Sequence, residues 1–303
     1  MRVLMSGASG LLGRAISQAL QAQGSEITRL VRGNAKPGEI LWQPGKPLNP
    51  ALVSGFDAVI HLAGESVVGR WTVAKKQRIR DSRVLGTHTL AEAVANAAQK
   101  PTVFLAASAI GYYGNRGDEV LDETSVSGTG FLAETCREWE AAAGPVENAG
   151  IRTVHMRTGI VLSQHGGALD KMLPPFRLGL GGRLGSGQQW MSWIHLDDIV
   201  GAMLHLVSKE KVNGPVNLVA PTPVRNAEFT AVLGKVLSRP TIFAVPEFAL
   251  KLAMGEMAEE VLLGSQRVEP KQLTASGYDF KFRNLRDALE NLVGAKSAGH
   301  QNR

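Results

Sequence analysis

The sequence predicts an α/β protein built on a doubly wound parallel sheet, with a small, mainly helical lobe at its C-terminal end. In the first half of the chain, short apolar runs alternate with segments that repeat apolar residues at helical spacing. The apolar runs are nearly continuous, as expected of strands that are buried on both faces of a parallel sheet. The first run ends in a glycine-rich turn that opens a helix, which makes the expected sheet one of Rossmann type.

Each element of the first half follows from its own pattern. The apolar segment 2–5 predicts a strand, and helical spacing over 11–20 predicts the helix that Gly24 ends. The same reasoning predicts strands at 26–31, 57–63, 102–108 and 151–162, and helices at 75–98 and 130–143. The stretch 34–50 is rich in proline and glycine and predicts a loop with little regular structure.

After residue 162 the pattern changes. Five glycines and two prolines over 173–189 predict a mobile loop, and we expect its part 179–187 to close over a bound molecule. The sequence then predicts a strand and helix over 193–207, a strand at 214–220, and a helix at 226–237 with Asn226 as N-cap. We expect a Rossmann domain over 1–240 with a lobe insertion at about 165–192, a small C-terminal domain over 241–295, and a flexible tail over 296–303.

Composition argues against several classes of function. The 33 basic and 27 acidic side chains give a formal charge of +6 without a dense basic face, so we expect no nucleic-acid partner. No segment approaches the roughly 20 apolar residues of a membrane span, so we expect no membrane association. Cys136 is the single cysteine and excludes an intramolecular disulfide, which favours a cytoplasmic protein. The basic run 75–83 is typical of a solvated helix face, with a phosphate-facing helix as the alternative. The pattern does not indicate an oligomeric state.

The glycine-rich turn predicts a nucleotide cofactor site. Three glycines stand at spacing Gly-x-x-Gly-x-x-Gly, directly after a predicted strand and at the start of a predicted helix. Glycine lets the backbone turn tightly and approach a pyrophosphate, while the helix N-terminus offers free N–H groups and partial positive charge. The residues expected at the cofactor here are Gly7, Ser9, Gly10, Leu11, Leu12 and Gly13.

The end of the second strand indicates which cofactor binds. Proteins that bind NAD place an acidic residue there for the ribose hydroxyls, whereas this sequence has Arg32. A guanidinium pairs with a 2′-phosphate that a carboxylate would repel, so we expect NADP (NADPH) as the cofactor. Arg32 as an ordinary surface residue is the alternative, and Arg14 and Arg29 are weaker candidates for the same contact.

A second set of cofactor contacts follows the third strand. Leu62, Ala63 and Gly64 are small or apolar residues whose backbone can approach the adenine and ribose side. Glu65 can hold a hydroxyl, or it is a helix-capping or surface carboxylate. Arg83, on the helix predicted over 75–98, can reach the cofactor phosphate or ribose from the side.

These features together resemble the extended branch of the short-chain dehydrogenase/reductase superfamily. The chain is most similar to an atypical group in it, often called the epimerase family with a conserved small C-terminal domain. The resemblance rests on "SGASGLLG", "HLAGE", "WEAAA", "RTGIVL", "LPPFRLGLGG", "WIHLDDI", "GPVNLVAP", "NAEFT" and "LLGSQRVEPKQLTASGYDF". It implies a Rossmann domain, NADP binding, and a substrate lobe formed by late insertions and the C-terminal end.

One feature of that superfamily is missing. Its members use a serine and a Tyr-x-x-x-Lys pair, in which the lysine lowers the tyrosine pKa and the tyrosine moves the proton. The helix over 130–143 contains neither tyrosine nor lysine, and its candidate positions hold Phe131 and Thr135, or Leu132 and Cys136.

Other residues remain as candidates at the substrate. Ser108 matches the superfamily serine at the end of the fourth strand. Tyr112 and Tyr113 follow on the side of the sheet where ligands bind, as proton donors or equally as a pocket wall. We interpret Asp197 and Asp198 as groups that cap a helix or order the lobe, and His195 as a structural residue, with an acid or base at the cleft as the alternative.

The sequence therefore predicts an NADP-dependent oxidoreductase or epimerase-like enzyme that acts on a small polar substrate, with a sugar-type molecule as one candidate. We expect no metal, because the histidines show no ligand spacing. The alternative is a non-catalytic NADP-binding sensor or scaffold protein, which the missing tyrosine and lysine favour.

Overall fold

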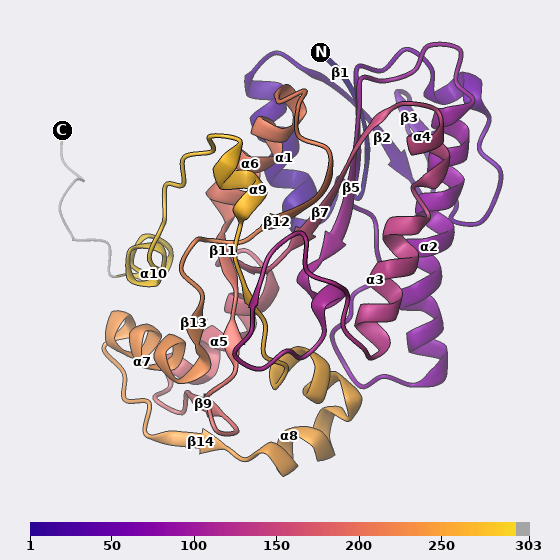
Figure 1. Ribbon diagram of the computed structural model, residues 1–303. Helices are drawn as coiled ribbons and strands as arrows, with labels where there is room; N and C mark the ends of the chain where they lie inside the picture. Colours follow the sequence, from indigo (N-terminus) through magenta and orange to yellow (C-terminus); the bar gives the residue numbers. More distant parts are fainter. Residues whose placement is uncertain (295–303) are drawn as a thin grey trace, which may run out of the picture.

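A computed structural model describes residues 1–294, and its centre is a seven-stranded parallel sheet (Figure 1). The strand order is β12-β7-β5-β4-β1-β2-β3. Strands β2 and β3 are added on one side of β1 and the later strands on the other side, so the strand order reverses between β1 and β4. The strands are β1 (Arg2–Ser6), β2 (Glu26–Val31), β3 (Glu39–Leu41), β4 (Ala58–His61), β5 (Val103–Ala109), β7 (Arg152–Thr158) and β12 (Gly214–Leu218). Ligands bind at the carboxyl ends of strands beside such a reversal.

Helices cover both faces of the sheet, which confirms the predicted doubly wound architecture (Figure 1). On one face, α1 (Leu11–Ala22) and α6 (Leu196–Ser208) enclose an apolar core. On the other face lie α2 (Val73–Ala95), α3 (Phe131–Ala141) and α4 (Gly144–Asn148), packed over a second core. Within residues 1–294, no helix is long and apolar enough to cross a membrane.

A smaller lobe lies below the sheet in Figure 1 and has its own apolar core. This core is formed by α5 (Gly167–Arg177), α7 (Asn226–Leu237) and α10 (Leu285–Val293). Its remaining elements are β8 (Ile160–Leu162), β9 (Gly182–Leu184), β10 (Trp190–Met191), β11 (Trp193–His195), β13 (Val224–Arg225), β14 (Phe243–Val245), α8 (Glu247–Met254) and a π-helical turn (Ala258–Leu262). Helix α9 (Lys271–Ala275) lies beside β12 of the main sheet, where Leu273 joins the core under α1 and α6. β6 (Val120–Leu121) pairs with β15 (Arg267–Val268) in a separate two-stranded sheet, which joins the C-terminal part to the segment that follows β5. The domain boundary at residue 240 stays a prediction, and the tail over 296–303 lies outside the described residues.

Two loops predicted from proline and glycine contain regular structure. The stretch 34–50 includes β3, which adds an edge strand beside β2. The loop predicted to begin at residue 173 begins later, because α5 continues to Arg177 through two prolines. Leu169, Leu173 and Phe176 recur on one face of α5 and are buried, and that burial outweighs the two missing backbone donors.

Two polar residues fix the lobe in ways that differ from the prediction. Asn226 is not the N-cap of α7, because Arg225 takes that position and the Asn226 amide accepts the N–H of Leu184 at 2.8 Å. At α6 the N-cap is His195 and not one of the two predicted aspartates, and its Nδ1 accepts the backbone N–H of Asp197 at 3.0 Å. Asp198 is fully buried and binds the backbone N–H groups of residues 281 and 282 at 2.8 and 2.9 Å. Asp198 therefore holds the C-terminal segment against the main domain, as its predicted ordering role requires.

Candidate cofactor and substrate site

The glycine-rich turn between β1 and α1 has a geometry that requires two of its glycines. Gly7 has a φ of +71°, and a Cβ there would lie 2.7 Å from the carbonyl carbon of Leu62. A Cβ on Gly13 would lie 2.1 Å from the carbonyl oxygen of Gly7. These two positions let the turn pack against the end of β4 and against α1. A Cβ on Gly10 would lie 3.3 Å from the carbonyl oxygen of Gly7, a contact that leaves more room. Gly10 and Ser9 are both exposed.

The N-terminus of α1 is suited to a phosphate group. Gly10 is its N-cap, and no side chain among residues 1–294 caps this end by a hydrogen bond. Leu11 and Leu12 follow, both half-buried, and Leu12 packs against the core under the turn. The backbone N–H groups of a first helical turn bind anions when no side chain satisfies them. The turn thus fits a pyrophosphate in backbone conformation, exposure and polarity.

A serine and a histidine that sequence reasoning missed hold the neighbouring backbone. The Ser6 hydroxyl at the end of β1 lies 2.6 Å from His61 Nδ1 at the end of β4. It also accepts the backbone N–H groups of Leu62 and Ala63 at 3.2 and 3.3 Å. Complete burial lowers the pKa of His61 to about 4, so the imidazole is neutral at physiological pH. The sequence signal that could have identified Ser6 and His61 is that each is a polar residue at the end of an apolar strand, and the two strands are adjacent and parallel.

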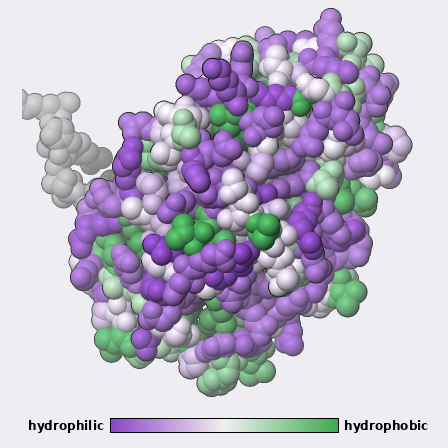
Figure 2. Space-filling view, in the orientation of Figure 1, coloured by the Kyte–Doolittle hydropathy of each residue, from purple (hydrophilic) through white to green (hydrophobic). Residues whose placement is uncertain are grey.

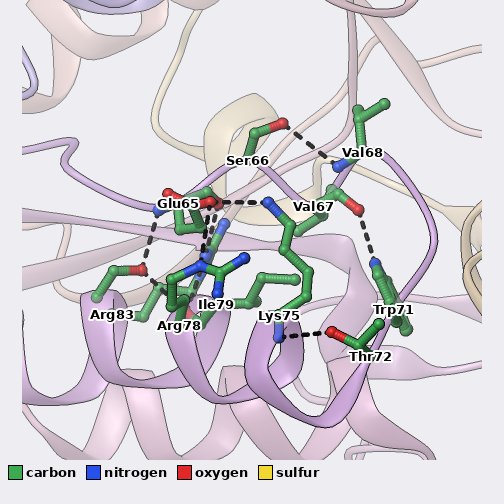
Figure 3. A network of polar contacts seen from close by, with 11 residues as sticks. Glu65, Ser66, Val67, Val68, Trp71, Thr72, Lys75, Arg78, Ile79 and Arg83 are labelled. Atoms are coloured by element: carbon green, nitrogen blue, oxygen red, sulfur yellow. Dashed lines mark hydrogen bonds and ion pairs between the residues drawn. The ribbon is translucent and has the colours of Figure 1, made fainter.

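Glu65 lies in a cluster of basic side chains beside this turn (Figure 3). Its carboxylate is 2.7 Å from Lys75 Nζ and 4.0 Å from Arg78 Nε. The hydrogen bond from Lys75 lowers the pKa of Glu65, and the nearby charges of Arg78 and Arg32 act in the same direction. Arg32 itself is exposed at the end of β2. The carboxylate of Glu65 is thus already paired, while the Arg32 guanidinium is available to solvent.

Arg83 lies beneath the loop that carries Gly64 and Glu65. Its guanidinium donates to the carbonyl oxygens of Glu65 and Ile79, both at 3.0 Å, and lies 4.9 Å from the ring centre of Trp139 (Figure 3). Burial lowers its pKa. The side chain lies under the loop, and its guanidinium carbon would be 3.3 Å from a Cβ placed on Gly64. Arg83 therefore orders the predicted cofactor loop, and its expected contact with the cofactor phosphate or ribose stays a prediction.

The basic run over 75–83 is partly paired within the protein. Besides Lys75, Lys76 pairs with Glu256 at 2.7 Å and Arg80 pairs with Glu138. These two ion pairs attach α2 to the lobe and to α3, so Lys76 and Arg80 are occupied within the protein, and the phosphate alternative for the rest of the run stays a prediction.

A row of buried polar residues crosses the sheet below the substrate side. Ser108 on β5, Arg157 on β7 and Asn217 on β12 are neighbours in register. Arg157 makes two 2.8 Å contacts to the carboxylate of Glu140 on α3, and the Ser108 hydroxyl donates to the same carboxylate at 2.6 Å. Burial disfavours the charge of Arg157, but the hydrogen bonds and charge of Glu140 outweigh it and raise the pKa of Arg157.

Ser108 is nearly buried and its hydroxyl is held by Glu140, so its expected catalytic role stays a prediction. Side chains alternate between the faces of a strand, and this alternation directs Ser108 toward α3, where it is only 4% exposed. Its neighbours Ala107 and Ala109 are the half-buried residues of this strand end. Thr158 pairs with Ala109 in register, is half-buried, and bonds only to the carbonyl of Met156 on its own strand. Thr158 is the hydroxyl at this edge that sequence reasoning missed.

The two tyrosines lie on one turn of 3₁₀ helix, Ile110–Tyr113, and differ in surroundings. Tyr113 is fully buried; its hydroxyl donates to Asn217 Oδ1 at 2.7 Å and accepts from Arg157 at 3.1 Å. Burial raises the pKa of Tyr113 to about 12. The Tyr112 ring is half-buried, and the Arg157 guanidinium lies 3.5 Å from its centre. Tyr113 is thus enclosed by the protein, and the expected role of Tyr112 at a substrate stays a prediction.

The start of α3, where the superfamily pair would stand, is closed by the C-terminal part of the chain. Glu260 on the π-helical turn accepts the backbone N–H groups of Phe131 and Leu132, both at 2.8 Å. Thr135 and Cys136 are buried, and burial raises the pKa of Cys136 to about 12. None of the four candidate positions on α3 supplies an acid or base.

Two adjoining cavities extend from the end of β5 into the lobe. The smaller, of about 170 Å³, reaches from Gly111 and Leu132 to Glu260. The larger, of about 550 Å³, lies between the loops 115–118 and 186–189 and helix α8. Asn115 and Glu259 line both cavities. The walls are mainly polar and charged, as expected for a site that takes a polar molecule.

The glycine-rich segment 179–187 forms a packed wall and not the lid that was expected. It contains β9, which pairs with β14. A Cβ on Gly181 would lie 2.4 Å from the Phe176 ring, and one on Gly182 would lie 2.0 Å from the carbonyl oxygen of Phe243. The glycines here permit close packing, so this segment has little freedom to close over a ligand.

Comparisons of sequence agree with this geometry. The model of the "NAD dependent epimerase/dehydratase family" matches residues 3–219, and the "Domain of unknown function (DUF1731)" matches residues 245–292. An epimerase family protein of Mycobacterium bovis is 44% identical over 290 residues, 95% of this chain and 96% of that protein. The epimerase family protein SDR39U1 of Homo sapiens is 36% identical over 297 residues, 97% of this chain and 100% of that protein.

Solved structures give the same assignment. The human epimerase family protein SDR39U1, crystallised with NADPH, is similar with a TM-score of 0.89 and 34% identity, over 97% of this chain and 99% of that one. A nucleoside-diphosphate sugar epimerase of Corynebacterium glutamicum has a TM-score of 0.80 and 40% identity, over 97% of this chain and 58% of that one. The chain belongs to the NAD dependent epimerase/dehydratase family, among the epimerase family proteins with a C-terminal DUF1731 domain.

Proposed function

We propose that this protein is an NADPH-dependent oxidoreductase or epimerase-like enzyme that acts on a small polar substrate of sugar type. The observation that carries the proposal is the pair of adjoining polar cavities that begins at Gly111, directly after β5. In doubly wound sheets this edge is where a bound dinucleotide presents its reactive ring. A sugar-type substrate is supported by the 40% identity to the protein named as a nucleoside-diphosphate sugar epimerase.

The residues present fit NADPH. The open N-terminus of α1 and the exposed Gly10 would hold the pyrophosphate. Arg32 would pair with the 2′-phosphate, and the backbone of Leu62 and Ala63 would face the adenosine. When bound, the nicotinamide supplies or accepts a hydride. The human relative that was crystallised with NADPH supports this choice of cofactor.

Arg32→Ala tests the cofactor. We expect NADPH affinity to fall about 10- to 100-fold, the loss of one hydrogen bond between charged groups, while NADH affinity changes by less than about 2-fold. Fluorescence titration of the reduced cofactor measures both dissociation constants. Arg286→Ala is the matched control, because Arg286 is an exposed arginine on α10 and is not among the residues expected at the cofactor. Equal losses of NADPH and NADH affinity would remove the argument for a 2′-phosphate contact.

A non-catalytic NADPH sensor or scaffold is the second candidate. It is favoured by the orientation of Ser108 toward α3, together with the absence of a tyrosine and lysine on that helix. Tyr112 and Thr158 remain as candidate side chains for proton transfer at the substrate edge.

Turnover separates the two candidates. We expect the protein to oxidise NADPH with at least one member of a panel of sugar and small-molecule carbonyl compounds. Tyr112→Phe should then lower kcat by about 10²-fold or more, as expected for loss of a general acid, with NADPH affinity unchanged. Thr158→Val examines the neighbouring hydroxyl in the same assay. NADPH binding without turnover of any compound would favour the sensor.

A further inference from the structure

The charged side chains that line the two adjoining cavities are more acidic than basic. They are four carboxylates and two cations, which gives the walls a net charge of −2: Asp118, Glu247, Glu259 and Glu260, against Arg225 and Lys251. Figure 2 shows a mainly hydrophilic surface on the side of the molecule where Figure 1 places the segment that follows β5. A molecule that enters these cavities therefore meets an excess of negative charge.

Arg225 lines the larger cavity but is already bound within the chain. Its guanidinium lies 3.0 Å from Asp118 Oδ1 and 4.7 Å from the ring centre of Trp190. The Trp190 indole N–H donates to the same Asp118 oxygen at 2.8 Å. This hydrogen bond and the charge of Arg225 lower the pKa of Asp118, so the carboxylate is ionised at neutral pH. An anion at Arg225 would have to share the guanidinium with Asp118.

Lys251, the second cation, lies between two carboxylates. Its Nζ is 2.7 Å from Glu247 and 3.1 Å from Glu259. The hydrogen bonds to Glu247 and Glu259 raise the pKa of Lys251, so the amine stays charged. The three side chains together carry a net charge of −1. Lys251 therefore does not offer a phosphate an unbalanced positive charge.

The N-terminus of α3 is the third group at these cavities that could bind an anion. Backbone N–H groups at the start of a helix bind phosphates and carboxylates. Here the carboxylate of Glu260 accepts the N–H groups of Phe131 and Leu132, both at 2.8 Å. The chain thus supplies its own carboxylate at each of the three positions where a phosphate could bind.

Uncharged polar groups form much of the remaining wall. They are side-chain amides and hydroxyls: Asn115, Thr129, Ser186, Gln188, Gln189, Ser265 and Gln266. The Asn115 side-chain N–H groups have no partner among residues 1–294, since its hydrogen bonds there use the carbonyl oxygen. Amides both donate and accept hydrogen bonds, as hydroxyl groups of a ligand require. The larger cavity, of about 550 Å³, has the volume of a small-molecule site.

We propose that the substrate is a sugar-type molecule without a phosphate or carboxylate group, so that neither a sugar phosphate nor a nucleoside-diphosphate sugar binds here. This inference rests on the proposed function, because it takes the two cavities as the substrate site. A diphosphate would add negative charge to walls that already carry an excess of it, and like charges repel. It would also have to break the ion pairs of Arg225 and Lys251, whereas an uncharged polyol needs only hydrogen bonds.

Saturation-transfer NMR on the full chain, with NADPH in excess to fill the cofactor turn, tests the proposal. The probes are free hexoses and pentoses, the 1-phosphate of each, and UDP-glucose. We expect at least one free sugar to bind with a dissociation constant below about 10 mM, at least about 10-fold tighter than its phosphate. UDP-glucose should not bind in the same range. Tighter binding of any phosphate or of UDP-glucose, or no binding of any free sugar, overturns the proposal.

A charge variant tests whether the carboxylates are what excludes phosphates. Asp118→Asn/Glu259→Gln brings the net charge of the walls to zero, and both side chains are more than half exposed, so the fold should be kept. We expect affinity for UDP-glucose to rise at least about 10-fold, with free-sugar affinity changed by less than about 3-fold. Asp279→Asn/Glu290→Gln is the matched control, since it removes two exposed charges that line neither cavity. A charge variant that binds UDP-glucose no better than the control contradicts the proposal.

Neither titration depends on turnover. Binding of a free sugar without oxidation of NADPH would remove the proposed enzyme and support this inference. Turnover of a nucleoside-diphosphate sugar would support the enzyme and overturn the inference.

Discussion

Glu140→Gln should lower the free energy of unfolding by about 3–5 kcal/mol, the cost of leaving a buried charge without its partner. Arg157 is 3% exposed, and Glu140 supplies both oxygens that its guanidinium contacts at 2.8 Å. Glutamine keeps the size of the side chain but removes the negative charge and puts an amide donor next to the guanidinium. Urea unfolding followed by circular dichroism measures the change.

The same buried pair positions the turn that carries Tyr112. Because the Arg157 guanidinium stacks on Tyr112 and donates to Tyr113, weakening the pair should also loosen this 3₁₀ turn. A cycle of Glu140→Gln, Arg157→Met and the double variant should therefore give a coupling energy well above that of a surface pair. Arg286 and Glu290 are a suitable control, since both are about half exposed on α10 and Glu290→Gln should cost less than about 0.5 kcal/mol. A Glu140→Gln protein as stable as this control would show that the buried charge has another partner.

The main architecture was predictable because the spacing of apolar residues along the chain indicates which side chains are buried. The strand predicted at 26–31 and the helix predicted at 226–237 have the same bounds in the structure. The glycine turn was predictable for the same reason, since strand, glycines and helix occur in consecutive residues. Proline and glycine misled where burial outweighed them, as in α5, whose buried Leu173 and Phe176 hold a helix through Pro174 and Pro175.

The directions in which side chains point at the site were harder to predict from the sequence. Whether Ser108 faces a substrate or α3 depends on the phase of the strand relative to the sheet, which a one-residue shift reverses. Arg83 lies on the predicted helix, but the rotation of α2 directs it under the loop at Glu65, where Trp139 of another helix packs on it. The role of Glu260 depends on a contact across more than a hundred residues. Such tertiary contacts leave no local pattern in the chain.

Two substitutions in the glycine turn should separate its structural role from its role at the cofactor. Gly13→Ala places a Cβ 2.1 Å from the carbonyl oxygen of Gly7 and 2.7 Å from Ala8 Cα, and neither backbone atom can move without disrupting the turn. We expect a loss of about 1–3 kcal/mol in the free energy of unfolding, typical of overpacking. Because the turn itself is displaced, NADPH affinity should fall more than 100-fold.

Gly10→Ala should behave differently, because Gly10 is exposed and its φ of −73° suits alanine. Its Cβ would lie 3.3 Å from the Gly7 carbonyl oxygen, a contact that a small shift relieves, so stability should change by less than about 1 kcal/mol. The added methyl group nevertheless occupies the space through which a pyrophosphate approaches the N-terminus of α1, and NADPH affinity should fall at least 10-fold. Thermal unfolding without cofactor and fluorescence titration with NADPH measure the two effects separately. Wild-type NADPH affinity in Gly10→Ala would mean that the pyrophosphate does not contact this turn, whatever the outcome for Gly13→Ala.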